Sequence, residues 1–322
     1  MELLSLENIS IGFKNKNYLS SAVKNISFKI KKGEILGIVG ESGCGKSITS
    51  LSIIGLLPDN AVITSGKLIF DNKNLLSLKN KERIKMMGEK ISMIFQEPMV
   101  SLNPLMKIGK QIEENIVQHR IIDKKTLKEE TLNLLKSTGI PDVESSYNKY
   151  PHELSGGQRQ RVIIAIAIAN QPDLIIADEP TTALDVTIQA QIIDLLKNIN
   201  KSRESSILFV SHDIGVIDEI CDSVVVMYFG EIIEKGSKKE IINNPKHPYT
   251  EGLLKCLPSD DLRGKKLYNI KGKVPDINSK IEGCPFKDRC DFVMDICKIE
   301  NPKEFKINEE HYVKCHKVIN NG

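Results

Sequence analysis

The most informative motif of this chain is residues 40–47, Gly40-Glu41-Ser42-Gly43-Cys44-Gly45-Lys46-Ser47. It fits the pattern G-x-x-x-x-G-K-[ST] and directly follows the apolar run 35–39. That run predicts a buried parallel strand, which feeds a helix from Ser47 to Leu57 that is stopped by Pro58. A strand, a glycine loop and a helix in this order predict a phosphate-binding loop. The alternative is a tight glycine turn with a surface lysine, which would require neither the strand before the motif nor the helix after it.

The residue types in the motif suit a bound phosphate. Glycines let backbone N–H groups turn inward around an anion, and the following helix adds the positive end of its dipole. Lys46 would then reach the β and γ phosphates of ATP, and the Ser47 hydroxyl would ligate Mg²⁺.

A pair of acids further along the chain complements this loop. Residues 174–179 read Leu-Ile-Ile-Ala-Asp-Glu, so the two carboxylates follow an apolar strand. Asp178 would hold Mg²⁺ through water, and Glu179 would polarise the attacking water. Taken alone, two adjacent carboxylates at a strand end are more often solvated charges of a loop. Together with the phosphate loop it predicts ATP hydrolysis.

The rest of the pattern indicates an α/β core with additions. Residues 3–38 alternate apolar and polar positions, which predicts an antiparallel sheet. Buried strands are expected at 91–95, 174–177 and 207–210, and helices within 108–138 and 157–170. Helices inserted between strands predict a helical subdomain at about 97–165. After residue 249 the periodicity weakens, and from residue 274 the chain becomes rich in cysteine.

Composition limits the classes of protein. The 322 residues are 40% hydrophobic and carry a net charge of +3, which gives no nucleic-acid footprint. The start has no signal-peptide pattern, and the apolar run 162–169 is far too short to span a bilayer. We therefore expect a cytosolic chain, in which seven cysteines are buried thiols or metal ligands rather than disulfides.

A further motif gives the resemblance to a family. Residues 154–158, Leu-Ser-Gly-Gly-Gln, lie between the phosphate loop and the acid pair, and this order closely resembles the ABC ATPase superfamily over residues 1–250. Gln96 matches the family's Q-loop, residues 183–185 (Ala-Leu-Asp) its D-loop, and His212 its switch histidine. Phe13, or less readily Tyr18, resembles the aromatic that stacks on adenine, although Phe13 also suits ordinary strand core.

The resemblance implies a full set of site residues. Catalysis is expected from Glu179, His212 and Gln96, and Mg²⁺ ligation from Ser47, Gln96 and Asp178. Nucleotide binding is expected from Phe13, Gly40, Ser42, Gly43, Cys44, Gly45, Lys46, Ser47, Thr49, Asp178, Ser155, Gly156, Gly157, Gln158 and Asp185. Cys44, at a helix N-terminus beside Lys46, is expected to have a lowered thiol pKa.

The signature segment, residues 154–158, also implies partners. A helix N-terminus with two glycines is a second anion-binding end, which in the family closes over the γ-phosphate held by another subunit. The resemblance therefore implies a distinct but related second ATPase, two transmembrane permeases and an extracytoplasmic binding protein, with this chain on the cytoplasmic face of the membrane.

The C-terminal part resembles one branch of the family. Residues 244–250, residues 101–104 and the cysteine-rich tail resemble the oligopeptide and dipeptide importers, with nickel or metal-chelate import as the alternative cargo. We expect an ABC-type nucleotide-binding domain at 1–250, with a mixed sheet core, an antiparallel β subdomain and a helical subdomain, and a small extension at 251–322.

Four cysteines of this extension follow the spacing C-x5-C-x6-C-x17-C: Cys284, Cys290, Cys297 and Cys315. Four thiols in a segment too small for its own core suggest a metal site. The spacing distinguishes neither zinc nor iron and sulfur, whereas the resemblance implies a [4Fe–4S] cluster. Zinc and free thiols remain alternatives, with His311 and His316 as reserve ligands.

Two rival functions share some of these motifs. DNA-maintenance ATPases separate the phosphate loop and the signature by coiled coils or DNA-binding inserts, and this chain has neither heptads nor a basic stripe there. ATPases that act on ribosomes carry two nucleotide domains, and no second phosphate-loop motif occurs in this sequence. Both are therefore disfavoured.

Overall fold

The computed structural model describes residues 1–14, 18–182, 184–257 and 268–319. Its contacts divide the chain into two compact units. The helix-rich unit comprises residue 1 and residues 31–34 and 77–209, and the strand-rich unit comprises residues 2–30, 35–76 and 210–322. Each unit is described by itself.

The strand-rich unit contains a four-stranded sheet in the order β2-β1-β4-β5. Its strands are β1 (Glu2–Lys14), β2 (Leu19–Lys31), β4 (Ala61–Phe70) and β5 (Lys73–Asn74), followed by the short helix η1 (Leu75–Ser77). β1 and β4 run antiparallel, with Leu4 opposite Phe70 and Phe13 opposite Ala61. The antiparallel sheet predicted for the N-terminal region is therefore confirmed, and β4 is an additional partner.

A second group of strands in this unit has the order β11-β12-β10-β9-β3. These strands are β3 (Ile35–Val39), β9 (Ser223–Tyr228), β10 (Glu231–Ser237), β11 (Phe305–Asn308) and β12 (His311–Val313). β3 pairs with β9 in parallel and is buried along its whole length, as a strand covered on both faces must be. β12 adds to β10, with Val313 opposite Glu234, so the end of the chain extends the same strand order.

Helices of the strand-rich unit follow these strands. They are α1 (Lys46–Ile54), α9 (Ile214–Ile220), α10 (Lys238–Asn243), α11 (Pro248–Lys255), η4 (Lys287–Arg289), α12 (Asp295–Ile299) and α13 (His316–Ile319). The prediction that α1 continues to Leu57 was wrong. The helix ends earlier because Gly55 adopts a left-handed conformation (φ 82°), a common way for helices to terminate.

The helix-rich unit begins with the helix α2 (Asn80–Met86). It contains the parallel strands β6 (Ile91–Ile94) and β7 (Leu174–Asp178). The next strand in the sheet order is β8 (Ser206–Ser211), whose last two residues belong to the other unit. Its other helices are α3 (Pro98–Ser101), α4 (Ile108–His119), α5 (Lys124–Ser137), α6 (Val143–Asn148), η2 (Pro151–Glu153), α7 (Gly156–Ile168) and α8 (Val186–Arg203).

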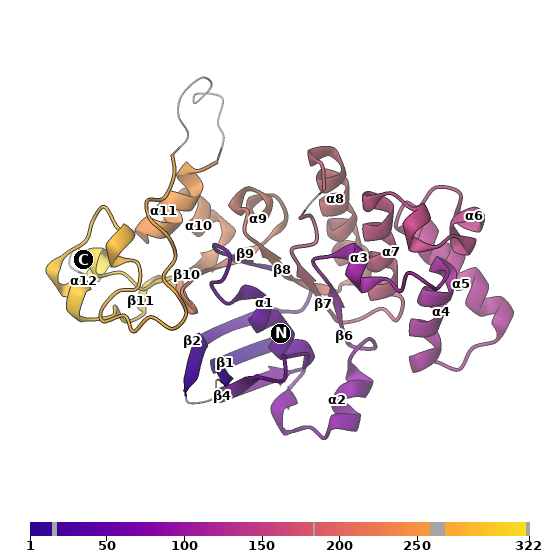
Figure 1. The fold of residues 1–322 in the computed structure, drawn as a ribbon, viewed down its shortest axis with the longest axis horizontal. Coiled ribbons are helices and arrows are strands. Elements are labelled where there is room, and N and C mark those ends of the chain that lie inside the picture. Colours follow the sequence, from indigo (N-terminus) through magenta and orange to yellow (C-terminus); the bar gives the residue numbers. More distant parts are fainter. Residues whose placement is uncertain (15–17, 183, 258–267, 320–322) are drawn as a thin grey trace. The chain divides into compact units, whose positions relative to one another are not determined.

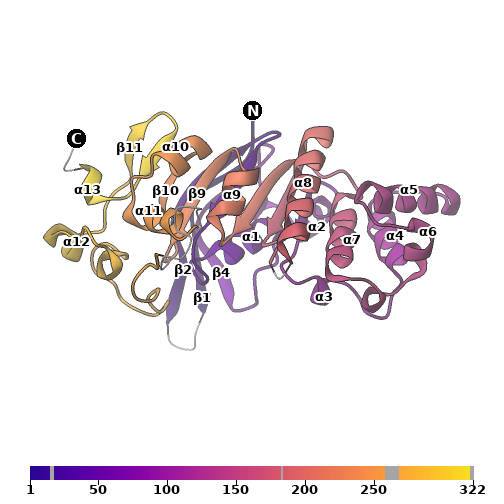
Figure 2. The ribbon, with the colours of Figure 1, turned by 90° about the horizontal axis from the view of Figure 1, so that it is seen from above.

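The helices between β6 and β7 form a cluster of their own. Helices α4, α5, α6 and α7 gather together in both views (Figures 1 and 2) and pack against one another. The expected helix-rich stretch 108–138 is broken into α4 and α5, because Asp123 caps the start of α5 by accepting the N–H groups of Lys125 and Thr126.

Candidate nucleotide site

The phosphate loop, residues 40–47, lies in the strand-rich unit and connects β3 to α1. Gly43 and Gly45 have φ of 82° and 103°, values that residues other than glycine rarely adopt. Gly40 meets a different constraint, because a Cβ there would lie 2.2 Å from the carbonyl oxygen of Met227. Gly45 is the N-cap of α1, and no side chain caps this helix end. Because the N-cap is a glycine, it has no side chain to satisfy the first N–H groups of α1, as suits a phosphate site.

Lys46 is folded over the loop that precedes it. Its side chain is buried, and its ammonium donates to the carbonyl oxygens of Gly40 (2.7 Å) and Glu41 (3.2 Å). The amine therefore already lies within the loop whose phosphate it is predicted to contact. Ser47 follows in the first turn of α1, with its side chain half-buried.

The prediction of a lowered pKa for Cys44 was wrong. The side chain is fully buried, and burial raises the pKa of its thiol despite the opposing charge of Lys46. The cysteine therefore packs inside the loop as a neutral thiol. Thr49 is buried as well, and its hydroxyl donates to the carbonyl oxygen of Gly45 at 2.8 Å.

The remaining predicted residues of this unit lie in separate segments. Phe13 is half-buried near the end of β1, and the alternative Tyr18 is 57% exposed. His212 is exposed directly after β8, in a turn where the Asp213 N–H donates to the Ser211 hydroxyl. Asp213 in turn caps α9.

The helix-rich unit holds the acid pair. Asp178 is buried at the end of β7, and Glu179 follows with a left-handed backbone (φ 47°), a conformation that is strained for a non-glycine residue by about 1–3 kcal/mol. The Glu179 carboxylate accepts from the side-chain amide of Gln96 (3.0 Å) and from the Thr182 hydroxyl (2.9 Å). The structure thus brings together Gln96 and Glu179, two of the three residues predicted to be catalytic.

The signature segment, residues 154–158, begins α7 in the same unit. Ser155 is its exposed N-cap, and its hydroxyl accepts from the Gln158 N–H (3.3 Å) while the Gln158 side chain accepts from the Ser155 N–H (3.0 Å). This reciprocal pair is a capping box. Among the described residues, nothing lies within 4 Å of a Cβ built on Gly156, whereas one on Gly157 would contact Ile188.

Asp185 caps α8 by accepting the Ile188 N–H at 2.9 Å. It is the last residue of the predicted D-loop, and Ala183, the first residue of that loop, lies outside the described residues. The structure therefore gives the predicted Asp185 a capping role, to which any contact with nucleotide would be added.

Two residues near the phosphate loop were missed by sequence reasoning. The Tyr249 hydroxyl accepts from the Glu41 N–H (2.8 Å), and the Arg289 guanidinium donates to both carboxylate oxygens of Glu41 (2.5 and 2.9 Å). Tyr249 stood in a segment noticed only for its resemblance, and Arg289 stood beside a cysteine. No local pattern links either residue to position 41.

The four cysteines of the extension line a single cavity of about 10 Å³, the size of one water molecule at most. Burial raises the pKa of the Cys284 thiol to about 12 and that of Cys315 to about 11. Among the described residues, no group of three or more His, Cys, Asp or Glu side chains is arranged to hold a metal ion. The four thiols thus share one small cavity, and within the described ranges they have no geometry that would hold a metal ion.

Both reserve ligands, His311 and His316, already have polar contacts within the extension. The two ring nitrogens of His311 contact carboxylate oxygens of Glu234 (2.7 Å) and Glu240 (3.2 Å). His316 lines the thiol cavity, and its Nε2 lies 2.9 Å from the carbonyl oxygen of Glu300. His311 is therefore a structural residue of the extension.

Comparison with known proteins identifies the family. Residues 23–182 match the ABC transporter family, and residues 233–297 match the oligopeptide/dipeptide transporter C-terminal region. The chain is 45% identical over 315 residues to the dipeptide transport ATP-binding protein DppD of Bacillus subtilis (strain 168), which covers 98% of this chain and 94% of the relative. This chain belongs to the ABC transporter ATP-binding proteins.

Other relatives agree with this assignment. The ABC ATPase is 46% identical to the oligopeptide transport ATP-binding protein OppD of Bacillus subtilis (strain 168), over 97% of this chain and 88% of the relative. It is 42% identical to the dipeptide transport ATP-binding protein DppD of Escherichia coli (strain K12), over 98% of this chain and 97% of the relative.

Solved structures give the same fold. A dimeric ATP-binding cassette in a post-hydrolysis state with ADP and Pi matches with a TM-score of 0.66 and 32% identity, over 73% of this chain and 99% of that one. A dimeric bacterial ABC transporter cassette also matches with a TM-score of 0.66, at 33% identity over 73% of this chain and 99% of that one. The predicted ABC ATPase fold and ATPase activity are confirmed.

Within the described ranges, none of the helices of this ABC ATPase has both the length and the apolarity that crossing a bilayer requires.

Proposed function

We propose that this ABC ATPase powers the import of oligopeptides or dipeptides. The observation that carries the proposal is the match of residues 233–297 to the oligopeptide/dipeptide transporter C-terminal region, joined to near full-length similarity to dipeptide and oligopeptide transport ATP-binding proteins. Import of nickel or a metal chelate is the alternative that the test below must exclude.

We propose the following division of work at the nucleotide. The backbone of residues 40–47 encloses the phosphates, and Lys46 leaves the carbonyl oxygens of its own loop to neutralise the β and γ phosphates. Ser47, Asp178 and Gln96 would hold Mg²⁺, which supplies charge to the phosphate oxygens when bound. Support comes from the buried position of Lys46 and from the loop glycines.

Glu179 is proposed as the base that accepts a proton from the attacking water. Its carboxylate is held by Gln96 and Thr182, so one side of it is oriented before nucleotide arrives. His212 is proposed to stabilise the γ-phosphate as the water attacks. The strained backbone of Glu179 supports the role of Glu179 as the base, because such conformations cluster at functional sites.

The signature segment is proposed to act on the nucleotide of a second ATPase. Ser155, Gly156, Gly157 and Gln158 would bind the γ-phosphate held by the partner's phosphate loop, with Asp185 beside that interface. ATP then joins the two subunits, and hydrolysis separates them. We propose a partner that is related but not identical, as an importer of this group would use.

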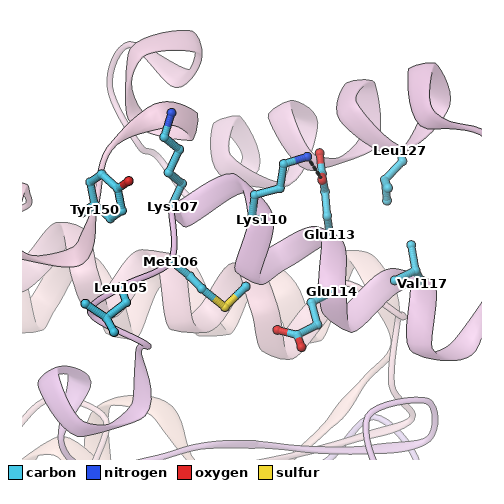
Figure 3. Close-up of a pocket in the computed structure, with 9 residues that line it drawn as sticks. All are labelled: Leu105, Met106, Lys107, Lys110, Glu113, Glu114, Val117, Leu127 and Tyr150. Carbon is cyan, nitrogen blue, oxygen red and sulfur yellow. Dashed lines mark hydrogen bonds and ion pairs between the residues drawn. The ribbon is translucent and has the colours of Figure 1, made fainter.

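An open groove in the helix-rich unit is proposed to receive a permease helix. It has a volume of about 540 Å³ and is lined by residues of α4 and its neighbours (Figure 3). Leu105, 86% exposed, and Val117, 49% exposed, give it apolar contacts, while Lys107 and Glu114 supply charges at its border. An amphipathic helix of a membrane subunit would place its apolar face on these exposed apolar side chains.

Localisation and further partners follow from this proposal. The ATPase would associate peripherally with the cytoplasmic face of the membrane through two permeases, and an extracytoplasmic binding protein would deliver the peptide. The same proposal divides the chain into an ATPase domain at 1–250, with a helical subdomain at about 97–165, and an extension at 251–322.

Uptake of a radiolabelled dipeptide by cells lacking the gene tests the proposed cargo. The wild-type chain is expected to restore uptake, and Glu179→Gln is expected to reduce it about 10²–10⁴-fold, the usual contribution of a general base. Asp194→Asn, which changes an exposed acid of α8, is the matched control and should restore uptake fully. Restoration of nickel uptake without dipeptide uptake would reject the peptide assignment.

We also propose that Cys284, Cys290, Cys297 and Cys315 hold a metal group, an iron–sulfur cluster of the [4Fe–4S] type in preference to zinc. The convergence of the four thiols on one cavity supports this. Iron and acid-labile sulfide should be found in anaerobically purified protein, with brown colour, and Cys284→Ser should lose both. Stoichiometric zinc without iron would favour zinc, and neither metal would leave four structural thiols.

A further inference from the structure

Glu41 is held from three directions within the strand-rich unit. Its N–H donates to the Tyr249 hydroxyl, and its carboxylate accepts two hydrogen bonds from Arg289. Its carbonyl oxygen accepts from the Lys46 ammonium (3.2 Å) and from the Cys44 N–H (3.3 Å). A residue inside the phosphate loop is therefore fixed by side chains that follow it by more than 200 positions.

Arg289 is itself tightly constrained. Its side chain is only 4% exposed, and its Nε donates to the carbonyl oxygen of Lys271 at 2.8 Å. The guanidinium lies 5.7 Å from the ring centre of Tyr228 and 5.9 Å from that of Phe286. The Glu41 carboxylate is the main cause that raises the pKa of Arg289 above its ordinary value. A bidentate pair with a buried guanidinium and a half-buried carboxylate is stronger and more directional than a fully exposed ion pair.

The segment that carries Arg289 also carries the thiols. Arg289 ends η4, and Cys290 follows it directly, on the wall of the thiol cavity. Phe286 packs against Tyr249 and Tyr228, with ring centres 5.4 and 5.3 Å away. One short stretch of the extension thus contacts both the cavity and the side chains that hold the phosphate loop.

We propose that Arg289 is a positioning residue of the nucleotide site, which keeps Glu41 and its peptide groups in the shape that receives ATP. Nucleotide binding requires Lys46 to leave the carbonyl oxygens of Gly40 and Glu41. Because Tyr249 and Arg289 hold Glu41, the loop keeps its shape when the Lys46 hydrogen bonds are lost. Nucleotide binding then costs less conformational entropy. This inference rests on the proposed role of residues 40–47 as the phosphate site.

A role in fastening the extension alone is the competing explanation. It predicts that loss of Arg289 lowers folding stability and the active fraction, without changing the nucleotide affinity of the folded chain. A positioning role predicts a rise in KM for ATP, with kcat per folded chain kept at saturating ATP, because a binding interaction common to ground and transition state is lost.

The experiment uses the purified full-length chain with Arg289→Ala, Arg289→Lys, Glu41→Gln and the double variant Glu41→Gln/Arg289→Ala. Lys298→Ala is the control, because Lys298 pairs with exposed Asp295 in the same extension. Equilibrium binding of a fluorescent ATP analogue, ATPase KM and kcat, and melting temperature are measured together.

Arg289→Ala is expected to weaken nucleotide binding about tenfold, equal to roughly 1.4 kcal/mol, and to raise KM in parallel. Arg289→Lys restores the charge without the bidentate geometry and should recover only part of the affinity. The double variant should bind no worse than the weaker single variant. Lys298→Ala should match the wild type.

Three results would overturn the inference: wild-type affinity in folded Arg289→Ala, additive losses in the double variant, or an equal loss in Lys298→Ala. If Arg289→Ala does not fold, the same comparison is made between Arg289→Lys and Glu41→Gln, and wild-type affinity in both overturns it. Lys46→Ala separates the two levels. Unchanged nucleotide binding in that variant rejects residues 40–47 as the phosphate site, whereas its loss with normal Arg289 variants rejects only the positioning role.

Discussion

The phosphate loop and the signature segment are both glycine-rich starts of helices, yet they are built differently. The phosphate loop is packed: Lys46 and Cys44 are buried, and the N-terminus of α1 has no side-chain cap. The signature segment is exposed at Ser155, and the N-terminus of α7 is closed by its own capping box.

This difference indicates how each segment meets an anion. The phosphate loop is held by the distant side chains of Tyr249 and Arg289, and under our proposal a single chain binds nucleotide there. At the signature segment, Ser155 and Gln158 satisfy each other's N–H groups, and an incoming phosphate must exchange with those bonds. Such a segment suits a contact that forms only when a second subunit arrives.

Alanine at Gly40 and at Gly156 separates the two designs most sharply. At Gly40 the new Cβ would lie 2.2 Å from the Met227 carbonyl oxygen and 2.8 Å from the Cys44 sulfur, so the loop must move. We expect nucleotide affinity to fall about a hundredfold or more, equal to roughly 2.7 kcal/mol. At Gly156 the Cβ would have no atom of the described residues within 4 Å, and the chain should fold and bind nucleotide normally.

Binding of a fluorescent ATP analogue to each purified variant checks this pair, with melting temperature as the control for folding. Normal binding by Gly40→Ala would show that the loop is not packed as described. Lost binding by Gly156→Ala would mean that the signature segment serves the nucleotide of its own chain.

Ser155→Ala tests the second half of the comparison, with an expected effect on hydrolysis and none on nucleotide binding by the single chain. Loss of the capping hydroxyl should cost about 1 kcal/mol of stability. Hydrolysis in the assembled transporter should fall about 10²-fold or more, because a donor to the transition state is removed. Nucleotide binding by the single chain should not change.

The dependence of the ATPase rate on the concentration of the added second ATPase subunit distinguishes a lost contact between subunits from a loss of stability. Ser155→Ala should lose the rise in specific activity that accompanies pairing, and Ser145→Ala, at an exposed serine of α6, provides the matched control. A Ser155→Ala enzyme that retains full activity at every concentration contradicts the proposed role of the signature segment.

Local patterns predicted much of this molecule. The apolar run 35–39 followed by a glycine loop predicted a buried strand entering a helix, and β3 and α1 have that arrangement. The need for glycine in the loop was also predictable, because Gly43 and Gly45 adopt conformations that few other residues adopt. Glu179 was predicted from the acid pair and Gln96 from the resemblance, and the structure joins their side chains by a hydrogen bond.

What sequence could not predict depends on burial and on distant partners. The helix after the phosphate loop ends at Ile54 rather than at Leu57, because Gly55 adopts a left-handed conformation before Pro58 is reached. The ion pair of Arg289 with Glu41 joins residues 248 positions apart, and charge alone offers many equally plausible partners. For Cys44, the helix N-terminus and Lys46 were visible in sequence, whereas the burial that outweighs them was not.

Cys44 gives the smallest expected effect. Because burial raises its pKa, the thiolate that reacts with iodoacetamide forms only above the ordinary range, so at pH 7–8 Cys44 should label far more slowly than in the urea-unfolded chain. The sign for stability follows from the same shift. The fold favours the neutral thiol, so its contribution to stability is fully present below the thiol pKa of the unfolded chain. That contribution is lost as the pH rises from the unfolded pKa through the folded pKa.

Labelling of the folded chain at pH 7, 8 and 9, followed by peptide mass analysis, measures this reactivity. Cys44→Ala assigns the signal and should lose only about 1 kcal/mol of stability. Arg289→Ala, if it loosens Glu41, should make Cys44 label faster, since the Cys44 N–H donates to the Glu41 carbonyl. Fast labelling of the wild-type chain at pH 7 with loss of ATPase activity would instead mean that the loop opens readily and is not held in advance.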